Sequence, residues 1–192
     1  MGAVRRVRRA AGLLAAASAA AVAWFCTAAS AASTSAPDLI SVGFGAHDAW
    51  ALRSSTDTPR RRSNDMRLEY RFGTSLLPFT DPYVRFHPWV GLEANTDGML
   101  YGAVGILADI PVGPLILTPG IGAGLWRRGG SKHLGSAVDF RSTLELGYRF
   151  ENGVRLSAYV SHMSNAGLTE TNPGADTVGA YLHVPVSFVF GR

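Results

Sequence analysis

The sequence predicts an all-β protein, an eight-stranded antiparallel transmembrane β-barrel of the bacterial outer membrane. Between Leu39 and Phe190, eight stretches alternate between apolar and polar residues, and we expect no amphipathic helix of any length among them. Most of these stretches reach about 10 residues, the length that a tilted strand needs to cross a bilayer. The third observation is a segment with the features of a secretory signal, which precedes them.

The N-terminal segment has the successive regions of a signal peptide. Four arginines stand within the first nine residues, residues 10–28 are apolar and rich in alanine, and Ala29-Ser30-Ala31 offers small residues for cleavage. An uncleaved membrane anchor is the alternative, because about 19 apolar residues can just span a bilayer. Small residues continue to Ser35 without a cationic flank, which favours the signal peptide. We therefore expect a signal peptide at 1–31 and a barrel domain at 32–192.

Charge and cysteine content limit the partners and the disulfides that can be expected. The full chain has 18 basic and 14 acidic side chains and a formal net charge of +4. Residues 1–31 hold four arginines and no other charge, so the mature chain is close to neutral. No nucleic-acid partner is therefore expected. Cys26 lies in the expected signal, so the mature chain has no disulfide.

The alternation gives each expected strand one apolar and one polar face, because successive side chains of a strand point to opposite sides. The polar faces carry many charges, such as Arg67, Glu69, Arg141 and Glu145. A soluble sandwich would expose the charges and bury the apolar face, whereas a membrane barrel does the reverse. The even strand number, the strand lengths and the signal favour the barrel, whose closure also removes exposed edges. The expected strands are Leu39–Ala46, Met66–Phe72, Tyr83–Asn95, Leu100–Ile110, Leu115–Leu125, Val138–Phe150, Val154–Asn165 and Thr177–Phe190.

Loop lengths predict the orientation in the membrane. With the N-terminus in the periplasm, three of the four outer connections are long and two of the three inner turns are tight, as is usual for such barrels. The long outer connections are His47–Asp65, Trp126–Ala137 and Asn165–Asp176.

A candidate catalytic set lies at the outer end of the seventh strand. His162 and Ser164 fall on the same face of this strand as its apolar residues. Asp176 likewise falls on the apolar face of the eighth strand. Residues two apart on one strand face are about 6.5–7 Å apart, so the imidazole and the hydroxyl can meet. A hydroxyl becomes a nucleophile beside a base, and the base needs a third group to orient it. The oxyanion would be held by Asn165 and by backbone N–H groups around Ala166 and Gly167.

The segments HMSNAG (162–167) and NPGAD (172–176) resemble the active-site region of the lipid A 3-O-deacylase (PagL-type) outer-membrane family. The segments RLEYRF (67–72) and LELGYRF (144–150) resemble its barrel strands. The resemblance implies hydrolysis of the ester-linked 3-hydroxyacyl chain at position 3 of lipid A. It implies Ser164 as nucleophile, His162 as general base and Asp176 as orienting acid. Asp176 stands where the best-known members have glutamate, and Gly191-Arg192 follow Phe190 where a terminal aromatic residue is usual.

The alternative is a non-catalytic barrel with a structural or adhesion role, in which the His–Ser pair merely ends a strand. The shared parity, the downstream carboxylate and the loop motif favour the esterase. Its expected partner is lipopolysaccharide in the outer leaflet, and a homodimer is one possible assembly. Outer-loop cations are expected to contact lipid A phosphates. These cations are Arg60, Arg61, Arg62, Arg127, Arg128 and Lys132.

We expect no cofactor and no metal site. Four further histidines lack any paired ligand spacing along the chain. These histidines are His47, His87, His133 and His183.

Overall fold

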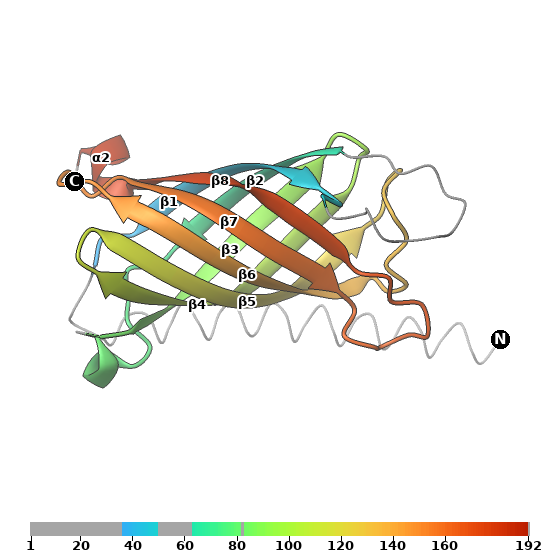
Figure 1. Ribbon diagram of the computed structural model, residues 1–192, viewed down its shortest axis with the longest axis horizontal. Coiled ribbons are helices and arrows are strands. Elements are labelled where there is room, and N and C mark those ends of the chain that lie inside the picture. The colour runs from blue at the N-terminus through green and yellow to red at the C-terminus, as the bar shows by residue number, and fades with distance from the viewer. Residues whose placement is uncertain (1–35, 50–62, 82, 192) are drawn as a thin grey trace.

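The computed structural model describes residues 36–49, 63–81 and 83–191, and within them eight antiparallel strands form a closed barrel in sequence order (Figure 1). β1 pairs with both β2 and β8, so the sheet has no free edge. The strands are β1 (Leu39–His47), β2 (Ser63–Arg71), β3 (Arg85–Asn95), β4 (Leu100–Val112), β5 (Leu115–Arg127), β6 (Val138–Arg149), β7 (Arg155–Ser164) and β8 (Ala175–Pro185). The predicted fold class and all eight strands are confirmed. The predicted signal peptide and three of the loop arginines (Arg60, Arg61 and Arg62) lie outside the described residues.

Two short helices accompany the strands, η3 (Pro78–Thr80) and α2 (Val186–Phe190). α2 corrects the prediction that the last strand runs to Phe190. Pro185 pairs with Leu39, the first residue of β1, so β8 has no partner beyond this point. The Val186 N–H donates instead to the Asp38 carbonyl at 2.8 Å, and the chain turns into the helix. None of the helices in the described ranges is long and apolar enough to span a bilayer.

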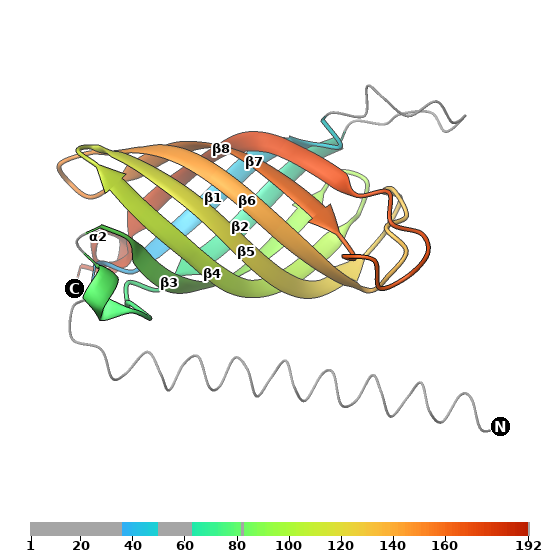
Figure 2. The same ribbon diagram turned by 60° about the horizontal axis from the view of Figure 1, so that its bottom comes forward.

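The barrel has two ends that are used below as reference points (Figure 2). The terminal end holds the start of β1 and α2, at the left of the view. The site end holds the end of β7 and the start of β8, at the right. His162 and Asp176 both lie at the site end.

The apolar residues of the barrel wall face outward, as the alternation predicts. Phe44, Leu68 and Leu146 each expose more than half of their surface. The residues between them, such as Arg67, Glu69 and Glu145, are almost fully buried in the lumen. An apolar exterior around a polar interior is the arrangement of a barrel that crosses a membrane.

Ion pairs and aromatic rings fill the lumen. Arg71 bonds Glu69 at 2.8 Å and Glu145 at 2.6 Å, and Arg141 pairs with Glu69. The Tyr181 hydroxyl donates to Glu69 at 2.8 Å, and Arg71 stacks over the Tyr181 ring. Arg71, Glu69 and Glu145 thus hold one another in a packed lumen that supports the wall.

Candidate functional site

Three neighbouring strands bring one residue each into a row across the outer wall. On β7, His162 is directly paired with Ser142 of β6 on one side and with Asp176 of β8 on the other. Directly opposite residues have Cβ atoms about 4.5–5.5 Å apart, so their side chains can touch. The strand register therefore places an imidazole between a hydroxyl and a carboxylate.

His162 and Asp176 form a hydrogen bond on this outer wall. Nδ1 of His162 lies 2.7 Å from Oδ1 of Asp176. Their side chains are 51% and 38% exposed, so a molecule that lies against the wall can reach both. When Nδ1–H donates a hydrogen bond to the carboxylate, the neutral imidazole keeps the lone pair of Nε2 free to accept a proton. This is the tautomer that a general base requires.

Gly174 fixes the direction of the imidazole. A Cβ atom built on Gly174 would lie 2.6 Å from Cε1 and 3.0 Å from Nε2 of His162. Met163 pairs with Ala175, so Gly174 and Ser164 both lie one step further toward the site end. The Nε2 edge of the ring therefore leans toward the level of Ser164 and away from the level of Ser142.

Ser164 is the last residue of β7 and continues its outward-facing row. Its side chain is partly exposed, with the same parity as His162. The hydrogen bonds of the described residues do not include one between Ser164 and His162. Catalytic contacts are often long in ligand-free structures and tighten when substrate binds. The structure thus places all three expected catalytic residues on one face of the wall, with a hydrogen bond between His162 and Asp176.

The three expected oxyanion donors are placed differently from one another. Asn165 is fully buried, and its amide nitrogen donates to the Leu134 carbonyl at 2.7 Å and to the Thr171 carbonyl at 2.8 Å. The Gly167 N–H donates to Oδ1 of Asn165 at 2.9 Å. Within the described chain, the Ala166 N–H has no hydrogen-bond partner, and Ala166 is exposed with a φ of 52°. Ala166 is thus the one of the three with an N–H available to a ligand.

Ser142 is a site residue that the sequence reasoning missed. It is exposed on the outer wall beside His162 and pairs with Ile121 on its other side. The signal was present, because a serine interrupts the apolar parity between Phe140 and Leu144.

The other histidines lie away from this row. His183 is buried in the lumen between Ser157 at 2.9 Å and Ser41 at 2.7 Å. His87 lies 3.4 Å from Asp109, beside a cavity of about 320 Å³ at the terminal end. This cavity is at the opposite end of the barrel from His162. His47 is buried in the lumen at the site end, on the other side of the wall from His162.

The chain is similar in sequence to one known protein. The lipid A deacylase PagL of Pseudomonas aeruginosa (strain PAO1) is 31% identical over 67 residues, which cover 35% of this chain and 39% of that protein. The match thus spans well under two thirds of this relative's length.

Two solved structures show the same fold. The outer membrane enzyme PagL superposes with a TM-score of 0.57 at 20% identity, over 77% of this chain and 99% of that one. Neisserial surface protein A superposes with a TM-score of 0.51 at 13% identity, over 79% and 99%. Proteins with different names share this fold, so the function must be argued from the residues of the site and not from the fold.

A family model described as lipid A 3-O-deacylase (PagL) matches residues 64–185. This range covers well over half of the chain and contains the whole row formed by β6, β7 and β8. The chain belongs to the lipid A 3-O-deacylase (PagL) family.

Proposed function

We propose that this chain is an outer-membrane serine esterase that removes the ester-linked 3-hydroxyacyl chain at position 3 of lipid A. The observation that carries the proposal is the 2.7 Å hydrogen bond between His162 and Asp176 on an apolar wall, with Ser164 on the same face. Charged and polar groups are costly on a lipid-facing surface, so a paired set there needs a functional reason. Family membership supplies the substrate class.

In the proposed reaction, Oγ of Ser164 attacks the ester carbonyl of an acyl chain that lies along the wall. Nε2 of His162 takes the hydroxyl proton, and Asp176 holds the imidazole and stabilises its charged form. The bond between the acyl carbon and the sugar oxygen then breaks, and the imidazolium returns the proton to that oxygen. Water enters by the same base-assisted route, cleaves the acyl-enzyme and releases a 3-hydroxy fatty acid.

The negative oxygen of the tetrahedral intermediate needs donors that are not already used. The Ala166 N–H meets this condition, since the Asn165 amide and the Gly167 N–H are engaged within the loop. We assign Ala166 the oxyanion contact and Asn165 the task of shaping the loop that presents it.

The outer wall next to Ser164 suits the acyl chain. Val160 of β7 pairs with Leu144 of β6 and Val178 of β8, one row nearer the membrane centre than His162. These side chains form an apolar strip on which a fatty acyl chain can lie while its ester reaches the site end.

The deciding experiment is lipid A mass spectrometry after expression in a host that lacks such an enzyme. We expect wild type to yield lipid A that has lost one 3-hydroxyacyl chain, and Ser164→Ala to yield none. Ser142→Ala is the matched control, because Ser142 is the other hydroxyl beside His162. Continued deacylation by Ser164→Ala would exclude Ser164 as the nucleophile, and loss of activity only in Ser142→Ala would transfer that role to Ser142.

A non-catalytic barrel is the second candidate, because a fold alone does not imply catalysis. It predicts that wild type leaves lipid A unchanged in the same assay. Intact lipid A from a correctly folded wild-type barrel would favour this candidate over the esterase.

The predicted contacts with lipid A phosphates and the homodimer remain proposals. In the structure, Lys132 pairs with Asp48 at 3.3 Å and Arg128 donates to the Ser131 carbonyl at 2.7 Å, while Arg127 is exposed. Replacing the six loop cations by glutamine tests the phosphate contacts through lipid A binding, and sedimentation in detergent tests the dimer.

A further inference from the structure

The charges buried in the lumen do not balance. Apart from the partly exposed Arg85–Asp81 pair at the terminal end, four lumen guanidinium groups of the described residues face six carboxylates. The arginines are Arg67, Arg71, Arg141 and Arg155, and the acids are Asp65, Glu69, Glu93, Asp109, Asp139 and Glu145. A buried carboxylate without a positive partner is strongly unfavourable, so a deficit of two positive charges requires compensation.

The deficit falls in the half of the lumen toward the site end. In the other half, Arg155 pairs with Asp109 at 2.7 Å and Arg71 pairs with Glu145 at 2.6 Å. Toward the site end, Arg67 and Arg141 face a larger number of acids, because Asp65, Glu93 and Asp139 lie there together with the shared Glu69.

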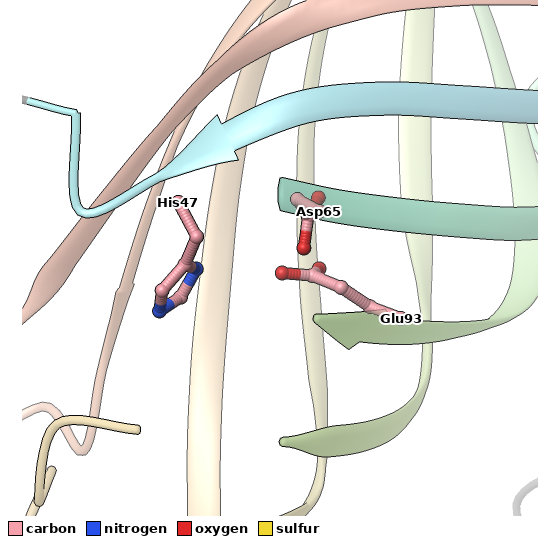
Figure 3. A group of neighbouring side chains, drawn as sticks. All are labelled: His47, Asp65 and Glu93. Atoms are coloured by element: carbon pink, nitrogen blue, oxygen red, sulfur yellow. The ribbon is translucent and has the colours of Figure 1, made fainter. Parts of the chain in front are cut away.

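Three ligand-type side chains converge at this place. His47 of β1, Asp65 of β2 and Glu93 of β3 each offer one ligand atom, and these atoms lie within 4.8 Å of one another. Figure 3 shows the imidazole on one side and the two carboxylates facing it from the adjacent strands. The three side chains expose only 4%, 1% and 1% of their surface.

Two carboxylate oxygens in this group have no partner. Oδ1 of Asp65 and Oε1 of Glu93 are buried and make no hydrogen bond within the described chain. Their second oxygens are held by Arg67, at 2.8 Å for Asp65 and 3.1 Å for Glu93. Each carboxylate is thus oriented through one oxygen and has the other available to a ligand.

The imidazole is oriented in a similar way. Nδ1 of His47 lies 3.2 Å from Oγ1 of Thr177, which orients the ring. A hydrogen bond of this kind usually accompanies a metal-bound histidine.

We propose that His47, Asp65 and Glu93 bind one divalent transition-metal cation, of which Zn²⁺ is the probe of choice. One imidazole nitrogen and two carboxylate oxygens suit Zn²⁺ better than Mg²⁺ or Ca²⁺, which prefer all-oxygen sites. The spacing of these residues along the sequence did not indicate a metal site, because the pairing of three neighbouring strands brings them together.

Two contacts connect the site with the strands of the proposed catalytic row. Thr177, which contacts His47, follows Asp176 in the chain. Arg67, which holds both carboxylates, donates to Oγ of Ser161 at 2.8 Å, and Ser161 precedes His162. A bound cation would therefore stiffen the wall beneath the His162–Asp176 pair and have a structural role.

The test is metal binding by the full chain, purified in detergent and treated with a chelator. Titration with Zn²⁺ in a calorimeter is expected to show saturable binding of one ion per chain and a higher Tm. His47→Gln and Glu93→Gln are each expected to weaken binding at least tenfold. His133→Gln, which removes an exposed loop histidine, is expected to bind as wild type does. Ca²⁺ and Mg²⁺ are expected to bind more weakly than Zn²⁺.

Protonation is the competing explanation, since two bound protons would also remove the charge deficit. It predicts no saturable Zn²⁺ binding to wild type and a higher Tm of the metal-free chain in Asp65→Asn. That result would overturn the proposal, and so would Zn²⁺ binding that survives unchanged in His47→Gln. X-ray absorption of the zinc-loaded wild type gives a second readout that needs no variant, and a ligand shell without imidazole would also overturn it.

Discussion

Gly174 lies directly against the imidazole of His162, so that a Cβ atom at this position would fall 2.6 Å from Cε1. Gly174 is buried and has a φ of 61°, a left-handed conformation that glycine adopts without strain. The imidazole occupies the space that any other residue would need. The loop before β8 therefore sets the direction of Nε2 as much as the carboxylate of Asp176 does.

The first prediction is that Gly174→Ala lowers kcat about 100-fold, because a displacement near 1 Å of a catalytic group has an effect of this size. The control is Gly113→Ala, since Gly113 has a φ of 62° and no atom within 4 Å of an added Cβ. Both variants share the backbone strain of alanine at positive φ, about 1–2 kcal/mol, so the difference isolates the contact with the imidazole. Equal activity of the two variants in a lipid A deacylation assay would contradict this account.

The second prediction concerns the carboxylate. Asp176→Asn is expected to lower kcat by about 10⁴-fold, because an amide no longer favours the required imidazole tautomer or its charged form. Asp176→Glu is expected to retain activity, since the wall is open around this half-exposed side chain. Kinetics on purified lipid A in detergent compare the two. An active Asp176→Asn enzyme would remove Asp176 from the mechanism, whatever the result for glutamate.

The third prediction separates a loop-holding role from an oxyanion role for Asn165. Its buried amide donates to two carbonyls and to the Thr169 hydroxyl, and its Oδ1 accepts from Gly167. Asn165→Ala leaves the Leu134 carbonyl and the Gly167 N–H without this partner, while the Thr169 hydroxyl still donates to the Thr171 carbonyl at 3.0 Å. The cost is about 1–3 kcal/mol for each unpaired group that stays buried. We expect a lower Tm and a lower kcat together. A fall in kcat with an unchanged Tm would assign Asn165 to the oxyanion instead.

The barrel could be predicted because a period of two is a local signal. Each strand shows it over its own length, as in β6, where Asp139, Arg141 and Glu145 alternate with apolar residues. The same signal failed at the C-terminus. Val186 and Phe188 continue the alternation, but pairing stops at Pro185 because β1 begins at Leu39. Where a strand ends because its partner strand begins there, the end cannot be predicted from the sequence of that strand alone.

The site was predictable in part for the same reason. Parity along β7 placed His162 and Ser164 on one face, and parity along β8 placed Asp176 on it. Neighbours across strands require the register, which depends on loop lengths and closure. Ser142 beside His162 and Thr177 beside His47 are contacts of that kind, and the second joins residues 130 positions apart.

The fourth prediction concerns the ion pairs that support the wall. Glu145→Leu leaves Arg71 buried with Glu69 as its remaining carboxylate, since Arg71 otherwise bonds Glu145 at 2.6 Å. Removal of one partner of a buried pair typically destabilises a protein by about 3–5 kcal/mol.

Replacing both partners removes the uncompensated charge. The double variant Arg71→Met/Glu145→Leu is therefore expected to recover much of the lost free energy of unfolding, measured in urea with lipid vesicles. Glu151→Gln, in the exposed turn between β6 and β7, is the control and is expected to stay within about 0.5 kcal/mol of wild type. Strictly additive single and double variants would show that the two charges are not coupled. Recovery in the double variant would show that the lumen network stabilises the barrel only while its charges are paired. An unpaired charge in the packed interior destabilises it.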